Sequence, residues 1–258
     1  MVTGASGAIG EAIARQIAAT AGHEVVLVGR HEGRITAAAA RIRAATGNKD
    51  VRHELVDLSR QAEVTALRAR WRGPLHVLVN NAAETPRRRQ ETPEGIERQF
   101  ASNVLGYYWM MTAFADLLRA SAPARVVNVA SYWAGGLDLD DLQFRRRPYD
   151  NDSAYRQSKQ ADRMLTVAFA EQVRDRDVAV NACHPGDVNS KLSNDLGFGG
   201  HESPDAGART PAWLATTETG QWSTGLYFEG QRPKSCRFGA DARSVAALWR
   251  ACAELSAP

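Results

Sequence analysis

Short apolar runs alternate with stretches of helical spacing along this chain, and this alternation constrains the fold more than any other feature. The apolar runs, which we interpret as strands, occupy residues 24–29, 53–56, 75–79, 125–130, 178–183 and 225–228. The helical stretches lie at about 35–45, 61–71, 94–119, 152–174, 210–216 and 242–255. Strands that alternate with helices at this spacing predict a parallel sheet covered by helices on both faces. The sequence therefore predicts an α/β, doubly wound architecture.

A glycine-rich turn lies at the N-terminus, directly before a helical run. Gly4, Gly7 and Gly10 are spaced three residues apart. Such a turn suits a pyrophosphate, because glycines permit close backbone approach and the helix N-terminus offers free N–H groups. We therefore expect a pyrophosphate-binding site at this turn, within a single domain over residues 1–258. Because so little of the chain precedes the turn, we also expect a truncated first strand and a start site internal to a longer gene product.

Composition excludes several other classes of protein. The 258 residues are 44% hydrophobic, which suits one α/β domain, and the formal charge of +3 is too small to argue for nucleic acid. Arginine clusters at 87–89 and 145–147 are interpreted as solvated loops. The three cysteines are widely spaced and predict neither a disulfide framework nor a metal site. Without a membrane-spanning run or signal peptide, we expect a soluble, cytoplasmic protein with no membrane anchor.

Tyr155 and Lys159 lie four residues apart on a stretch that we expect to be helical from about Asp152, a suitable N-cap. Their side chains therefore share one helix face. A phenol titrates near ~10, and a nearby ammonium lowers that pKa by favouring the phenolate. Bringing it to about 7 would take roughly 4 kcal/mol, more than one exposed lysine supplies, so a second cation or burial is implied. An amphipathic helix with a surface lysine carries the same pattern.

The other notable residues fall where predicted strands end: the glycine turn, Arg30, Asp57, Asn80, Ser131 and Pro185 with Gly186. Ligands of open parallel sheets bind along the edge formed by the carboxyl ends of the strands. We therefore expect these residues to meet at one site. Residues 132–152 are expected to form an insertion loop near its mouth, and the Gly/Asn/Ser-rich residues 187–209 a mobile substrate lid.

In their order along the chain, TGASGAIG, Asp57, NNAA, Asn103, Ser131, YRQSK and HPG resemble the short-chain dehydrogenase/reductase family. The resemblance spans essentially the whole chain. It is closest to the retinol dehydrogenase-like branch, which includes the WW-domain oxidoreductases. That finer assignment depends on residues 121–129, the long gap from Ser131 to Tyr155, residues 225–228 and the tail at 248–249. The resemblance implies a single NAD(P)-binding Rossmann domain over residues 1–258. It also implies hydride transfer between a nicotinamide and a carbonyl or alcohol group.

The resemblance implies four catalytic residues. Tyr155 would be the general acid/base that exchanges a proton with the substrate oxygen, and Ser131 would position and polarise that oxygen. Lys159 would bind the nicotinamide ribose and lower the pKa of Tyr155. Asn103 would help to hold, through its backbone, a water that connects the lysine to solvent. The oxidised nicotinamide would be the second cation required above.

The resemblance also implies cofactor contacts, in addition to Tyr155 and Lys159. These are the diphosphate loop (Gly4, Ser6, Ile9 and Gly10), the adenine contact (Asp57 and Leu58), the segment beside the adenine ribose (Asn81 and Ala82) and the segment along the nicotinamide carboxamide (Pro185, Gly186 and Val188).

Arg30 bears on the choice of cofactor. Enzymes that use NAD favour an acidic residue at the end of the second strand, and neither Gly29 nor Arg30 supplies one. A guanidinium there suits a 2′-phosphate, which it can bind bidentately. The sequence therefore favours NADP(H) over NAD(H). The alternative is that Arg30 pairs with a surface acid such as Glu32.

Two other functions remain open. One is a non-catalytic NADP-binding sensor or scaffold on the same fold, although a pure binder has no need of Tyr155. The other is a nucleotide-sugar epimerase or dehydratase, which the three-spaced glycines suggest, although this chain lacks the long C-terminal substrate domain usual there. Trp109, Trp133 and Trp213 either line an apolar substrate pocket or pack the core and lid. We expect an apolar alcohol or carbonyl substrate and a homodimer or homotetramer.

Overall fold

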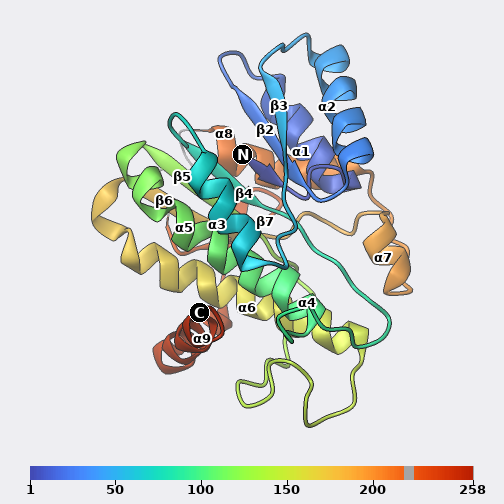
Figure 1. Ribbon diagram of the computed structural model, residues 1–258, viewed down its shortest axis with the longest axis vertical. Helices are drawn as coiled ribbons and strands as arrows, with labels where there is room; N and C mark the ends of the chain where they lie inside the picture. The colour runs from blue at the N-terminus through green and yellow to red at the C-terminus, as the bar shows by residue number, and fades with distance from the viewer. Residues whose placement is uncertain (218–223, 258) are drawn as a thin grey trace.

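The computed structural model describes residues 1–217 and 224–257. Within them lies one eight-stranded sheet (Figure 1). Its order is β3 (Val51–Leu55), β2 (Val25–Gly29), β1 (Val2–Thr3), β4 (Val77–Asn80), β5 (Ala124–Val129), β6 (Val178–Cys183), β7 (Tyr227–Glu229) and β8 (Arg232–Lys234). All neighbouring strands are parallel except β7 and β8. The predicted doubly wound α/β fold is confirmed.

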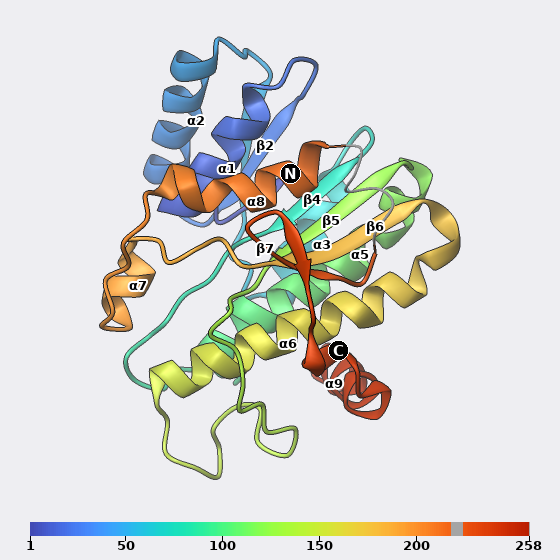
Figure 2. The same ribbon diagram turned by 180° about the vertical axis from the view of Figure 1, so that it is seen from behind.

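Helices cover both faces of the sheet (Figures 1 and 2). One face carries α1 (Ala8–Ala18), α2 (Glu32–Thr46) and α8 (Pro204–Thr216). The other carries α3 (Gln61–Arg70), α5 (Gly106–Ala120) and α6 (Asn151–Gln172), with α9 (Ala242–Glu254) packed on α6. The shorter elements are α4 (Arg98–Phe100), the π-helical η1 (Ala101–Leu105), the 3-10 helices η2 (Arg174–Arg176) and η4 (Arg237–Gly239), and α7 (Lys191–Asp195).

The strand β1 is only two residues long, as the sequence predicts, yet it occupies the centre of the sheet. Val2 pairs with Leu27 of β2 on one side and with Val79 of β4 on the other. The ammonium of Met1 donates to the carbonyl of Val77 at 2.8 Å. This short strand therefore places the glycine turn at the carboxyl edge of the sheet, between β2 and β4.

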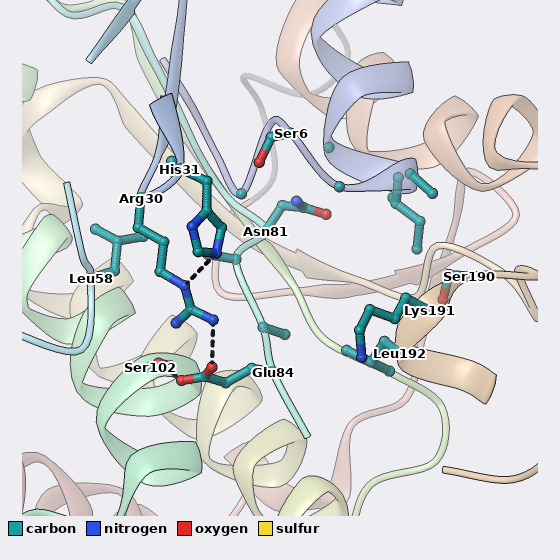
Figure 3. A pocket seen from close by; sticks show the side chains of 18 of the residues that line it. Ser6, Arg30, His31, Leu58, Asn81, Glu84, Ser102, Ser190, Lys191 and Leu192 are labelled. Carbon is teal, nitrogen blue, oxygen red and sulfur yellow. Dashed lines mark hydrogen bonds and ion pairs between the residues drawn. The ribbon is translucent and has the colours of Figure 1, made fainter. Parts of the chain in front are cut away.

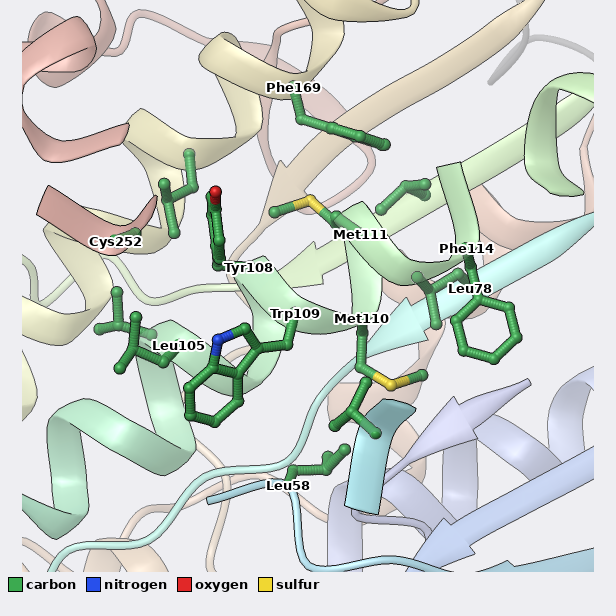
Figure 4. Packing of buried hydrophobic residues seen from close by; sticks show 14 of the residues in the cluster. Leu58, Leu78, Leu105, Tyr108, Trp109, Met110, Met111, Phe114, Phe169 and Cys252 are labelled. Atoms are coloured by element: carbon green, nitrogen blue, oxygen red, sulfur yellow. The ribbon is translucent and has the colours of Figure 1, made fainter. Parts of the chain in front are cut away.

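Apolar side chains of α5 form the middle of the larger core (Figure 4). Met110, Met111 and Phe114 are fully buried there, and Trp109 is 3% exposed. On the opposite face, the Trp213 ring lies edge-on to Phe228, with centroids 5.8 Å apart. Two of the three tryptophans considered for the substrate pocket therefore pack the core.

Several boundaries differ from the predicted ones. Helix α6 begins at Asn151 because the carboxylate of Asp150, not of Asp152, caps it by accepting from the N–H of Ser153. Helix α8 begins at Pro204, since Ser203 caps it and proline is tolerated at a first helical position. Residues 132–150 contain no helix or strand, in agreement with the predicted insertion loop.

No helix in the described ranges is both long and apolar enough to cross a membrane.

Candidate active site

A cavity of about 540 Å³ opens at the carboxyl ends of the central strands (Figure 3). It brings together every residue predicted for the diphosphate, adenine and adenine-ribose contacts: Gly4, Ser6, Ile9, Gly10, Arg30, Asp57, Leu58, Asn81 and Ala82. These residues come from four separate segments of the chain, which follow β1, β2, β3 and β4. The parallel topology unites them because each follows the carboxyl end of a strand.

Two glycines shape the wall of this cavity. A Cβ at Gly10 would lie 2.4 Å from the carbonyl oxygen of Gly4 and 2.5 Å from Nδ2 of Asn81. Gly4 has a φ of +63°, and a Cβ there would lie 2.7 Å from Cα of Ala82. Gly7 precedes α1, and no described side chain caps that helix, so the N–H groups of its first turn keep their donor capacity. The wall therefore fits a diphosphate, which needs a close, donor-rich backbone.

Thr3 fixes the segment after β4, which adjoins the glycine wall, and the sequence interpretation missed this residue. Its hydroxyl oxygen accepts from the N–H groups of Asn81 at 2.9 Å and Ala82 at 3.1 Å. The amide of Asn81 donates back to the Thr3 carbonyl at 2.9 Å. The sequence did offer a signal for the role of Thr3, because it is a polar residue in the short buried strand that precedes the glycine turn.

One end of the cavity is lined by charged side chains. Arg30 lies 2.9 Å from Glu84, not beside Glu32, so the sequence alternative named the wrong acid. Glu84 also accepts from Arg98 at 3.0 Å. Arg34, in the first turn of α2, lines the same end. The end therefore combines the guanidinium groups of Arg30 and Arg34 with the carboxylates of Glu84 and Asp57.

Asp57 is held firmly beside this end. Its carboxylate accepts from the Ser59 N–H at 3.0 Å and from the Ser59 hydroxyl at 2.7 Å. Burial opposes ionisation of Asp57, but these hydrogen bonds and the nearby Arg30 and Arg98 lower its pKa overall.

Ser131 and Tyr155 line a second cavity, of about 40 Å³, together with Pro185, Gly186 and Val188. The predicted nicotinamide segment and the predicted acid/base pair therefore lie together. Ile9, Ser190 and Leu192 line both cavities, which makes them the junction between the two. Sequence reasoning missed Ser190 and Leu192 because they lie within the stretch interpreted only as a lid.

The phenol of Tyr155 is buried and hydrogen-bonded. Burial raises its pKa, while the Lys159 ammonium and a hydrogen bond with the Ser131 side chain act in the opposite direction. The net effect leaves the pKa of Tyr155 above its ordinary value. In this structure the phenol is therefore a proton donor at neutral pH.

Lys159 lies on the same face of α6 but points into the core. Its ammonium donates to the carbonyl of Val129 at 3.0 Å and to the carboxylate of Asp162 at 2.9 Å. The ammonium lies 5.8 Å from the centre of the Tyr155 ring. Lys159 is not among the residues that line either cavity. The sequence interpretation did not include Asp162, although a carboxylate in the apolar run after Lys159 was a visible signal.

Asn103 lies in η1, where the helix from Arg98 to Ala120 locally widens to π geometry. Its side-chain oxygen accepts from the N–H of Glu84 at 2.9 Å, and its amide donates to the Glu84 carbonyl at 3.0 Å. The amide also lies 3.4 Å from the hydroxyl of Ser158. Asn103 therefore joins the segment after β4 to the helix that carries Tyr155.

Comparison with known proteins agrees with this geometry. A family model described as short chain dehydrogenase matches residues 1–197. The chain belongs to the short-chain dehydrogenase family. Within this family it is 33% identical to retinol dehydrogenase 13 of Mus musculus, over 99% of this chain and 82% of that protein. It is 30% identical to dehydrogenase/reductase SDR family member 12 of Homo sapiens, over 91% of this chain and 77% of that protein. The resemblance to retinol dehydrogenases is thereby confirmed.

Solved structures of the family have the same fold. An uncharacterised protein from Mycobacterium paratuberculosis superposes with a TM-score of 0.81 at 27% identity, covering 98% of this chain and 91% of that one. A 3-oxoacyl (acyl-carrier-protein) reductase from Agrobacterium tumefaciens, solved with NADP bound, gives 0.70 at 26% identity over 88% and 90% of the two chains. The chain is therefore a short-chain dehydrogenase-family oxidoreductase whose structural neighbours include NADP complexes.

Proposed function

We propose that this protein is an NADP(H)-dependent oxidoreductase in which Tyr155 exchanges a proton with the oxygen of a carbonyl or alcohol substrate. The observation that carries the proposal is the position of the Ser131 and Tyr155 hydroxyls. They lie together in the small cavity that joins the glycine-walled cavity at Ile9. A nucleotide-binding scaffold needs the glycine-walled cavity, but it does not need two hydroxyls in the small one.

Each catalytic residue has its own role in the proposed reaction. A bound nicotinamide would supply or accept a hydride at its C4 atom. Ser131 donates a hydrogen bond to the substrate oxygen and orients it. As the carbonyl becomes an alcohol, Tyr155 gives its phenolic proton to that oxygen; in the reverse direction the phenolate takes the proton back. Lys159 would bind the nicotinamide ribose, and the backbone of Asn103 would help to hold a water that connects the lysine to solvent.

The diphosphate would rest on Gly4, Ser6, Ile9 and Gly10, with the adenine beside Asp57 and Leu58 and its ribose beside Asn81 and Ala82. Pro185, Gly186 and Val188 would border the nicotinamide carboxamide. The proposed preference for NADP(H) depends on Arg30 and Arg34, which line the cavity and would lie beside the 2′ position of the adenine ribose. A 2′-phosphate would share Arg30 with Glu84 and gain bidentate hydrogen bonds.

An apolar substrate fits the residues around Ser131. The Trp133 ring lies edge-on to Phe198, with centroids 5.1 Å apart, and the Tyr132 side chain is half exposed beside His184. A volume of about 40 Å³ is too small for a substrate. Residues 187–209 would therefore act as a lid that moves away from the 132–152 loop. A homodimer or homotetramer is the expected assembly, which light scattering of the purified protein would test.

The test is a screen of apolar aldehydes, ketones and secondary alcohols with NADPH or NADP⁺, followed at the nicotinamide absorbance. Wild-type protein should turn over at least one of them. The Tyr155→Phe variant should keep its NADPH affinity and lose nearly all turnover. NADPH binding without turnover of any substrate by the wild type would support the sensor or scaffold alternative.

A further inference from the structure

Asp162 is a buried acid at the centre of the catalytic helix. It lies one turn beyond Lys159, and its residue is 0% exposed. One carboxylate oxygen, Oδ2, accepts from the Lys159 ammonium at 2.9 Å. The other, Oδ1, is buried and has no hydrogen-bond partner in the part of the chain that the structure describes. A carboxylate in such surroundings is stabilised almost entirely by its cation.

The ion pair changes what Lys159 can do for Tyr155. An isolated ammonium stabilises a nearby phenolate, whereas an ammonium compensated by a carboxylate at hydrogen-bond distance presents little net charge. Two of the three Lys159 N–H groups are also occupied, by Asp162 and by the carbonyl of Val129. The Tyr107 hydroxyl is a further hydrogen-bond partner of Lys159. The lysine is therefore held toward the core.

Lys159 and Asp162 are the charged groups that act on the Tyr155 phenol from its own helix, and Tyr132 acts from the loop after β5. The segment after β6 contributes His184 and the carboxyl side chain of Asp187, which line the small cavity together with Tyr155. The other neighbouring elements contribute groups that stay neutral. Burial raises the pKa of Tyr107 on α5, Cys183 on β6 and Cys252 on α9 above their ordinary values.

Arg163, the next residue of α6, points instead at the Ser131 carbonyl and the Tyr227 ring. Burial raises the pKa of Asp162 to about 7, against the lowering effect of Lys159. In the alkaline range where a phenol titrates, Asp162 is therefore ionised.

We propose that Asp162 is a positioning residue that neutralises Lys159 and holds it against the core, so that Tyr155 stays protonated over a wider pH range and the enzyme is adapted to carbonyl reduction. This rests on the proposed function. In reduction, the phenolic O–H bond breaks, its proton goes to the substrate oxygen, a hydride from the reduced cofactor goes to the substrate carbon, and solvent reprotonates the phenolate. Alcohol oxidation needs the phenolate from the start, which Asp162 disfavours.

The experiment measures the phenol directly, without turnover. Protein labelled with ¹³C at the tyrosine Cζ is titrated between pH 7 and 11 by NMR, with Tyr155→Phe used to assign the Tyr155 signal. In the wild type the Tyr155 midpoint should lie above ~10, the ordinary value for a phenol. In Asp162→Asn, which keeps the shape and removes the charge, the midpoint should fall by at least one pH unit.

Asp152→Asn is the matched control, because Asp152 lies on the same helix, also has a buried unpartnered oxygen and does not contact Lys159. Its Tyr155 midpoint should equal that of the wild type. An unchanged or raised midpoint in Asp162→Asn overturns the proposal. If that variant does not fold, a wild-type midpoint below ~10 overturns it equally well. The titration uses the protein without substrate, so its outcome is independent of the activity screen. The proposed role of Asp162 can fail while the proposed activity is confirmed, and the activity can fail while the role of Asp162 is confirmed.

Discussion

The guanidinium of Arg163 donates a hydrogen bond to the carbonyl oxygen of Ser131. The same guanidinium lies flat against the Tyr227 ring, 3.5 Å from its centre. Arg163 is 7% exposed, so this contact between α6, β7 and the end of β5 is shielded from water. Helix α6 thus supplies Tyr155 and, two turns later, the side chain that fixes the backbone of Ser131.

Replacing Arg163 by methionine should impair catalysis more than cofactor binding. The Ser131 carbonyl would lose its charged donor, and misplacement of a reacting group by about 1 Å can cost ~100-fold in rate. We expect kcat to fall about 10- to 100-fold while NADPH affinity changes less than about threefold. Arg163→Lys should recover part of kcat, because the charge returns without the planar stacking.

The control is Arg174→Met, which removes an exposed arginine paired with Glu171 just after the same helix. The Arg174→Met variant should have the same kcat and the same NADPH affinity as the wild type. Equal losses of kcat and NADPH affinity in Arg163→Met would indicate general damage to the fold and would contradict a positioning role.

Gly10→Ala should abolish NADPH binding. Its Cβ would lie 2.4 Å from the Gly4 carbonyl oxygen, so the turn must shift, at a cost of about 1–3 kcal/mol in unfolding free energy. Gly33→Ala is the control, since a Cβ there meets nothing within 4 Å. That helical substitution should stabilise the protein by up to about 1 kcal/mol. Thermal unfolding and NADPH titration report both effects, and normal NADPH binding by Gly10→Ala would refute the assigned diphosphate site.

Arg30→Gln should weaken NADPH binding about 10- to 100-fold, because a charge-assisted pair of hydrogen bonds contributes about 1.5–3 kcal/mol. NADH has no 2′-phosphate, so its affinity should change little. Fluorescence titration of both cofactors measures the difference. Equal losses of affinity for NADPH and NADH would show that Arg30 stabilises the cavity through Glu84 and does not bind the 2′-phosphate.

The stability of the protein should depend on pH through His184. Burial lowers the pKa of His184 to about 4. Between this value and the ordinary value of ~6.5, the unfolded chain binds a proton that the folded chain does not. The free energy of unfolding should therefore fall as the pH falls through this range, by up to about 3 kcal/mol from this residue.

His184→Gln should flatten that part of the profile, as measured by urea unfolding at pH 4.5, 5.5, 6.5 and 7.5. The exposed His201 provides the control, since His201→Gln removes a histidine without removing a buried ring. An unchanged slope in His184→Gln would mean that other groups cause the pH dependence.

The alternation of strands and helices was sufficient to predict the sheet and the edge where the site lies. Strands β2, β5 and β6 carry runs of buried residues, and the carboxyl edge follows from parallel topology. Strand β8 was missed because Arg232–Lys234 is exposed and polar, with no apolar pattern to detect. It forms only because it pairs with β7.

The site was predictable where a motif carries its own chemistry, as with Ser131 and Tyr155. The partner of Arg30 was not predictable, because Glu84 lies on another segment and sequence spacing gives no distance between segments. The partner of Lys159 was predictable but was missed, because Asp162 lies three residues further along the same helix.

In the proposed mechanism, hydride transfer to the substrate depends on the proton that Tyr155 donates. The most direct measurement is single-turnover reduction of a carbonyl substrate identified by the screen, with NADPH carrying deuterium at the transferred C4 position. Wild-type protein should place one deuterium on the product carbon. Tyr155→Phe, at saturating NADPH and with unchanged NADPH affinity, should do so at least about 100-fold more slowly, the lower end of what a general acid contributes. An equal rate of deuterium transfer in the two proteins would contradict the role of Tyr155 as the general acid.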